Sequence, residues 1–91
     1  MTTAWLNGAF LPLDEARIPA MDRGFLFGDG VYEVIPVYGK RLFRLEHHLR
    51  RLQNSLDAVR IGNPLANETW TSMLDELVRR NGDGDQAVYL Q

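Results

Sequence analysis

The chain has 91 residues, which is enough for one small domain with a modest hydrophobic core. Apolar residues make up 45% of it and charged residues 24%, the composition of an ordinary globular domain rather than of a disordered or membrane-spanning chain. The formal net charge of -2 supplies no overall positive field for a phosphate backbone, so we expect no nucleic-acid partner.

Cysteine is absent from the chain, which excludes disulfide bonds and thiolate metal sites. The adjacent His47 and His48 do not make a ligand set, so we expect no metal site. The first residues have no basic segment followed by a long apolar one, and nothing later approaches the roughly 20 apolar residues that a membrane span needs. We therefore expect a cytoplasmic protein without a membrane partner.

The first half of the chain carries the signals of β-structure. Two short apolar runs flank the turn dipeptide Asn7-Gly8, which predicts a hairpin of two antiparallel strands. Residues 31–38 alternate as a strand whose two faces are both largely apolar, with Glu33 on the face opposite Tyr32. Pro36 lies within this run, and because it cannot donate a ladder hydrogen bond, it should sit at an edge or bulge, or with its nitrogen turned away from a partner strand.

A turn at 38–40 should lead into a short strand at 41–44 that pairs back on 31–38. The period then changes, because apolar residues recur every three or four positions and predict a helix from Leu45 to about Arg60. That apolar stripe consists of Leu45, Leu49, Leu52, Leu56 and Val59. His48, Arg51 and Ser55 form a row along its flank, which predicts a half-buried Arg51 and a solvated Arg50.

A second helix should follow Pro64, capped by Asn67 or Thr69 and ended near Arg79 to Gly82. Its apolar face consists of Trp70, Met73, Leu74, Leu77 and Val78. Residues 86–91 then begin a strand, which the chain leaves unfinished. The sequence thus predicts an α+β fold in which two helices pack on a mainly antiparallel sheet, with 1–91 as part of a domain.

Three features of the chain are unusual for a plain structural domain. They are the glycine-punctuated segment 22–33, the carboxylate of Glu33 on an apolar strand face, and the row of His48 and Arg51 beside a buried stripe. Each has an ordinary structural explanation, since glycines make turns, a carboxylate can lie at a solvated sheet end, and an arginine stem can cover a core while its charge stays in water. Singly, these features indicate little.

Together and in this order, the segments resemble the amino-terminal domain of the class IV, or fold type IV, aminotransferases. The motifs are Asp22-Arg-Gly24, Phe27-Gly-Asp-Gly-Val-Tyr-Glu33, a Val-Tyr-Gly turn, and Glu46-His-His-Leu-Arg-Arg-Leu52 with Ser55. The Gly-Val-Tyr-Glu-Val form is most similar to D-amino-acid transaminases. Branched-chain transaminases tend to have Phe followed by Glu-Gly at this place, and aminodeoxychorismate lyases usually lack the Tyr-Glu pair.

The resemblance implies a two-domain, homodimeric enzyme that uses pyridoxal 5'-phosphate to move an amino group between a D-amino acid and a 2-oxo acid. It assigns the phosphate-binding arginine of the family to Arg51, with His48 as the matching histidine, and a substrate-pocket tyrosine to Tyr32. Glu33 would belong to the polar shell nearby, with His48. The lysine that holds the cofactor covalently in the family would lie beyond residue 91, since the single lysine, Lys40, sits in a predicted turn.

We therefore expect no catalytic residue within residues 1–91, no second domain, and no activity from this chain alone. Two related activities remain open for the whole protein, a branched-chain L-amino-acid transaminase and an aminodeoxychorismate lyase. A function of a different class also remains open, in which the chain is a non-catalytic module for binding or dimer contacts, because a fold does not by itself establish a function.

Overall fold

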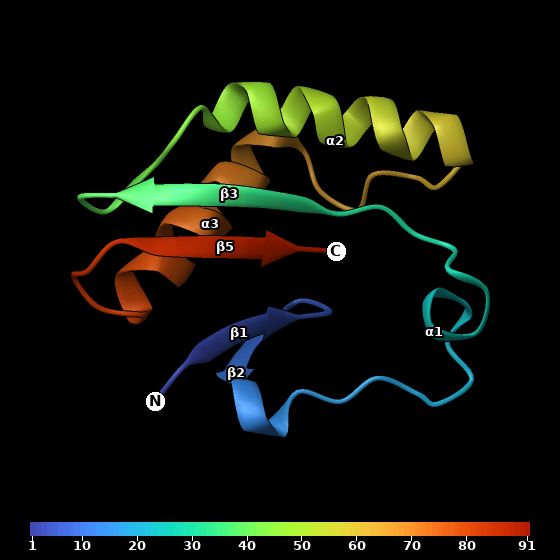
Figure 1. Cartoon of the computed structure of the whole chain (residues 1–91), viewed down its shortest axis with the longest axis horizontal. Coiled ribbons are helices and arrows are strands. Elements are labelled where there is room, and N and C mark those ends of the chain that lie inside the picture. The colour runs from blue at the N-terminus through green and yellow to red at the C-terminus, as the bar shows by residue number, and fades with distance from the viewer.

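A computed structural model describes all residues, 1–91, and shows an α+β fold of five strands and three α-helices (Figure 1). The strands are β1 Thr3–Leu6, β2 Ala9–Pro12, β3 Glu33–Tyr38, β4 Arg41–Leu42 and β5 Gln86–Leu90. The helices are α1 Arg23–Phe27, α2 Leu45–Val59 and α3 Asn67–Arg80, with a 3-10 turn at Leu13–Glu15. The predicted class, with antiparallel strands and two main helices, is confirmed.

The strands form two separate antiparallel sheets rather than one. The central strand β3 lies between β4 and β5. The last strand of the chain, β5, therefore pairs directly with β3, and Glu33 lies opposite Leu90. The β1–β2 hairpin turns at Asn7 and Gly8, whose φ angles of 49° and 96° are those that a tight hairpin turn requires. It makes a sheet of its own.

The side-chain amide of Asn81 attaches this hairpin to the end of α3. The backbone N–H of Thr3 donates to Asn81 Oδ1 at 2.9 Å, and Asn81 Nδ2 donates to the carbonyl of Thr3 at 3.0 Å. The amide therefore satisfies one donor and one acceptor of β1, as a neighbouring strand would. This contact attaches the hairpin to α3, while the hairpin forms a sheet separate from the three-stranded one.

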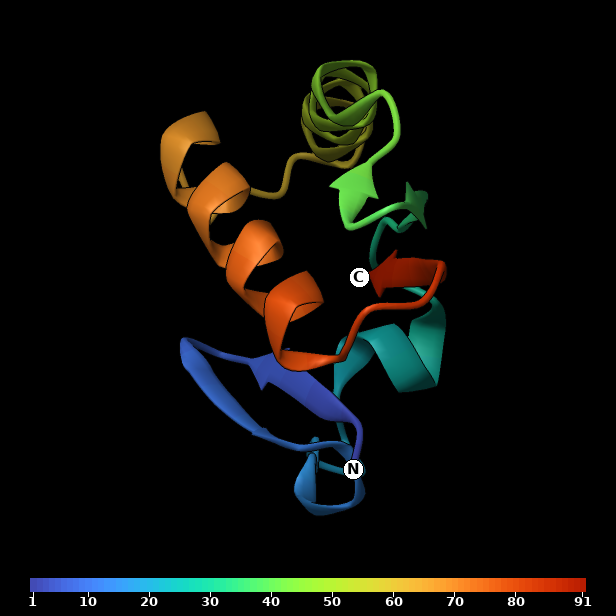
Figure 2. The same cartoon turned by 90° about the vertical axis from the view of Figure 1, so that its left-hand side faces the viewer.

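Helices α2 and α3 cover one face of the three-stranded sheet, and the core lies between these two layers (Figure 2). The buried apolar residues are Ile35, Val37, Leu49, Leu52, Leu56, Trp70, Leu74, Val78, Val88 and Leu90. Val59 was predicted on the buried stripe but is 48% exposed, because the sheet no longer lies beneath the last turn of α2. The other sheet face carries exposed apolar side chains that include Tyr32, Val34 and Tyr89.

Several local predictions are corrected by the structure. Strand β4 has two residues instead of four, and α1 was not predicted. Helix α3 begins after Ala66 without a side-chain cap, so neither Asn67 nor Thr69 caps it. None of the helices combines the length and the apolar composition needed to cross a bilayer.

Pro36 lies in the central strand, with its nitrogen turned away from β5 but toward the side of β4, just past the last residue of that two-residue strand. Its carbonyl accepts a hydrogen bond from Phe43 N–H at 2.8 Å, on the side of β3 that faces β4. The nitrogen and the carbonyl of one strand residue point to the same side, so the missing N–H removes no bond to β5.

Candidate functional site

The carboxylate of Glu33 is the one charged side chain that the fold buries, with 2% of the residue exposed. Strand alternation turns it toward α2, and both of its oxygens have partners there. His48 Nδ1 lies 2.7 Å from Oε1, and Arg51 Nε donates to Oε2 at 3.0 Å. No buried side-chain nitrogen or oxygen lacks a hydrogen-bond partner, so this polar cluster is satisfied within the apolar core.

Helical spacing places the two partners of Glu33 on the same flank of α2. His48 and Arg51 are three residues apart, which makes them neighbours on a helix surface. The predicted row of His48, Arg51 and Ser55 is therefore present, although no hydrogen bond joins the Ser55 side chain to the cluster. The sequence did not show that Glu33 joins His48 and Arg51, because Glu33 reaches them only when β3 packs beneath α2.

The cluster holds Glu33 in its ionised form. Burial acts to raise the pKa of the Glu33 carboxyl, but the hydrogen bonds from His48 and Arg51 and their positive charge outweigh burial, so the pKa lies below its ordinary value. An ionised carboxylate can only accept hydrogen bonds, so Nδ1 of His48 carries the proton in this contact.

More than half of the Arg51 side chain is exposed to solvent. The sequence predicted a half-buried Arg51, but 58% of its side chain is exposed in the structure. Only Nε is bound, and neither terminal nitrogen has a partner in the protein. The guanidinium is thus bound to Glu33 through Nε, while its two terminal nitrogens are free to bind a ligand.

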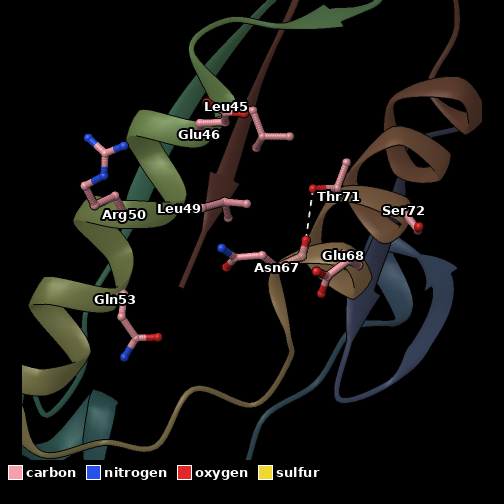
Figure 3. Close-up of a pocket in the computed structure, with 9 residues that line it drawn as sticks. All are labelled: Leu45, Glu46, Leu49, Arg50, Gln53, Asn67, Glu68, Thr71 and Ser72. Atoms are coloured by element: carbon pink, nitrogen blue, oxygen red, sulfur yellow. Dashed lines mark hydrogen bonds between the residues drawn. The ribbon is translucent and has the colours of Figure 1, made fainter.

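The neighbouring Arg50 lies in a different environment. It has no ion pair or side-chain hydrogen bond, and its guanidinium extends away from α3 beside a polar groove between α2 and α3 (Figure 3). That groove is lined by Leu45, Glu46, Leu49, Arg50, Gln53, Asn67, Glu68, Thr71 and Ser72. It includes none of Tyr32, Glu33, His48 and Arg51, so this groove is separate from the polar cluster.

Tyr32 lies on the opposite sheet face and is 64% exposed. Its ring stacks on Tyr89 of β5, with ring centroids 6.0 Å apart and planes inclined by 26°. The hydroxyl of Tyr89 donates to Oε1 of Gln91. Neither Tyr89 nor Gln91 was singled out from the sequence, although the alternation of residues 86–91 would have placed both on one face.

Comparison with known proteins decides the family of the chain. The family model described as amino-transferase class IV matches residues 30–91, which include the whole polar cluster and Tyr32. The chain belongs to the class IV aminotransferases.

Among proteins of known activity, D-alanine aminotransferases are similar in sequence to this chain. A D-alanine aminotransferase of Bacillus licheniformis is 40% identical over 85 residues, which cover 93% of this chain and 30% of that protein. One of Staphylococcus haemolyticus is 32% identical over 91 residues, covering 100% of this chain and 32% of that protein. The chain thus spans about a third of the length of these relatives.

Solved structures of branched-chain aminotransferases share the fold. One such enzyme, complexed with N-(5'-phosphopyridoxyl)-L-glutamate, superposes with a TM-score of 0.88 at 33% identity, covering 96% of this chain and 30% of that one. The Thermoproteus uzoniensis enzyme with norvaline also gives 0.88, at 28% identity, covering 97% of this chain and 31% of that one. The observed layers are therefore those of fold type IV.

Lys40 and the glycine-punctuated segment near residue 24 have local structural explanations. Lys40 sits at positive φ in the β3–β4 turn and pairs with Asp83, at the end of β3 remote from Glu33.

In the 22–30 segment the close backbone approach is at Gly24, where an added Cβ would lie 2.9 Å from the Asp22 carboxylate and 3.4 Å from the carbonyl of Asp29.

Proposed function

We propose that this chain is the partial amino-terminal domain of a pyridoxal-phosphate-dependent aminotransferase that moves an amino group between a D-amino acid and a 2-oxo acid. The similarity to proteins named D-alanine aminotransferase supports the substrate class. The chain spans about a third of their length, so in this proposal the second domain and the lysine that holds the cofactor belong to further polypeptide. The whole protein would be a homodimer, as the family resemblance implies, and a cysteine-free chain fits a reducing cytoplasm.

The observation that carries the proposal is the open guanidinium of Arg51. A planar guanidinium can donate two parallel hydrogen bonds to the oxygens of one phosphate, and both terminal nitrogens of Arg51 are without protein partners. The donor set therefore fits a phosphate group. When bound, pyridoxal phosphate supplies the electron sink for the chemistry at the substrate α-carbon, and the protein supplies orientation and electrostatics.

The other three site residues have separate roles in this proposal. The hydroxyl of Tyr32, exposed on the far face of β3, would donate a hydrogen bond to the substrate carboxylate. Glu33 and His48 would not touch substrate, since Glu33 is buried and each is bonded within the cluster. No side chain of residues 1–91 would act as the catalytic base, because Lys40 is tied to Asp83 at the hairpin turn.

A second candidate is a branched-chain L-amino-acid transaminase, which the superposition on branched-chain enzymes favours. Fold similarity alone does not separate the two, because both belong to one family with one architecture. The residue after Glu33 is Val34, where branched-chain members tend to have glycine, and this difference favours the D-specific reading.

Kinetics of the full-length protein test the proposal. With 2-oxoglutarate as amino acceptor, we expect D-alanine to be a far better donor than L-leucine, judged by kcat/KM. The 91-residue chain serves as a control and should show no transamination. Turnover of L-leucine alone would replace the first candidate with the second, and turnover of neither donor by a cofactor-loaded protein would contradict both.

A further inference from the structure

We propose that Glu33 is a positioning residue, which binds Nε of Arg51 so that the two terminal nitrogens of the guanidinium face a phosphate together. The inference rests on the proposed function, because the phosphate is that of the cofactor. Glu33 itself would touch neither cofactor nor substrate, since it is 2% exposed and both of its oxygens are occupied.

The division of the carboxylate between two partners decides how Arg51 is held. A carboxylate with both oxygens free can accept two parallel bonds from an arginine, which would consume a terminal nitrogen. Here His48 occupies Oε1 at 2.7 Å, and only Oε2 is left for Arg51, at 3.0 Å from Nε. The contact therefore restricts the guanidinium without using its outer edge.

Glu33 is also a firm support for this contact. Its backbone belongs to the central strand and pairs with Leu90 of β5, and its side chain is enclosed between sheet and helix. Arg51, in contrast, is 58% exposed and has no other polar contact. An unrestrained arginine would lose side-chain freedom on binding an anion, and a pre-positioned one loses less.

Charge alone would give Glu33 the opposite effect. Its negative charge partly cancels that of Arg51, so removing the charge would strengthen the attraction for an anion. If Glu33 positions Arg51, removing the carboxylate instead weakens phosphate binding, because the fork is no longer held. Whether phosphate binding strengthens or weakens when the Glu33 carboxylate is removed therefore shows whether Glu33 positions Arg51 or only neutralises its charge.

The test measures binding of pyridoxamine 5'-phosphate and of pyridoxamine to the full-length apoprotein by titration calorimetry. Neither probe needs a covalent bond to a lysine. The dissociation constant of pyridoxamine divided by that of pyridoxamine 5'-phosphate gives a ratio that isolates the phosphate contribution. We expect Glu33→Gln to reduce this ratio by roughly two- to tenfold, the loss that follows from ordering one flexible side chain on binding. Glu33→Asp keeps the charge but shortens the reach, and it should also reduce the ratio.

Controls separate this effect from a general structural loss. Glu46→Gln, an exposed position of α2, should leave the ratio unchanged. In an Arg51→Ala background, Glu33→Gln should have no further effect on the ratio, because it acts through Arg51. Thermal unfolding of each variant identifies any that do not fold, and Glu33→Asp keeps the test valid if Glu33→Gln is one of them.

Each outcome has a distinct meaning. A ratio that stays constant or rises in both Glu33 variants, or equal weakening of both probes, overturns the positioning role while leaving Arg51 as the phosphate ligand. If Arg51→Ala itself leaves the ratio unchanged, the phosphate site of the proposed function is wrong, and the role of Glu33 is overturned with it.

Discussion

Tyr32 and Glu33 are neighbours in the chain but lie on opposite faces of the central sheet, with 64% of Tyr32 and 2% of Glu33 exposed. The strand therefore presents an aromatic hydroxyl on one side and supports Arg51 on the other. In the proposed enzyme this separates substrate contacts from phosphate contacts, so substitutions on the two faces should have different kinetic signatures.

Substitution of Arg51 should weaken cofactor retention while substitution of Arg50 should not. Arg51→Ala removes a guanidinium whose terminal nitrogens are open to a phosphate, whereas Arg50 has no polar partner and lies outside the cluster. One charge-assisted hydrogen bond contributes about 1.5–3 kcal/mol, so the dissociation constant for pyridoxamine 5'-phosphate should rise roughly ten- to a hundredfold. Equal losses in the two variants would show that the wrong face of α2 has been assigned.

Tyr32→Phe should impair turnover of amino-acid substrates more than cofactor binding. The ring that stacks on Tyr89 is retained, and only the hydroxyl proposed to contact the substrate carboxylate is lost. A hydrogen bond to a charged group contributes about 1.5–3 kcal/mol, hence a loss of roughly tenfold or more in kcat/KM. Kinetics with D-alanine, alongside titration with pyridoxamine 5'-phosphate, measure the two effects, and unchanged kcat/KM would make Tyr32 a packing residue only.

The Glu33 cluster should make stability depend on pH in acid. The pKa of Glu33 in the folded chain lies below its ordinary value of 4.5, so its ionised form stabilises the fold above that value. This contribution should begin to fall as the pH drops to 4.5 and disappear below the folded pKa. Urea unfolding of wild type and Glu33→Gln between about pH 5 and about pH 3 measures it, as a shrinking difference in the free energy of unfolding.

The exposed Glu46→Gln substitution on α2 provides the control for this pH dependence, and it should reproduce the wild-type profile. A difference between wild type and Glu33→Gln that grows as the pH falls would contradict the ion pairing of Glu33 with His48 and Arg51.

Asn63→Ala should destabilise the fold although Asn63 lies in a connection between helices. Its Oδ1 accepts the indole N–H of Trp70 at 2.8 Å, and Trp70 is 6% exposed. Loss of the amide leaves that buried donor without a partner, which costs about 1–3 kcal/mol. Urea unfolding should show this loss, while Asn54→Ala, at an exposed position of α2, should change stability by less than about 0.5 kcal/mol.

Local patterns in the sequence determined most secondary structure and the facing of most side chains. The Asn7-Gly8 turn, the alternation that buries Glu33, and the spacing that puts His48 beside Arg51 are properties of consecutive residues, because strand and helix periods act over a few positions. The short length of β4 and the capping of α3 were missed, because element ends depend on neighbours that packing supplies.

The tertiary structure alone decided which of these residues meet. Glu33 joins Arg51 across 18 positions of chain, and Tyr32 meets Tyr89 because β5 pairs with β3. Periodicity states which face a side chain occupies but not which other element covers that face. The burial of Glu33 against His48 and Arg51 therefore became visible only when α2 was placed on β3, since pairing between distant segments follows from the packing of the whole core.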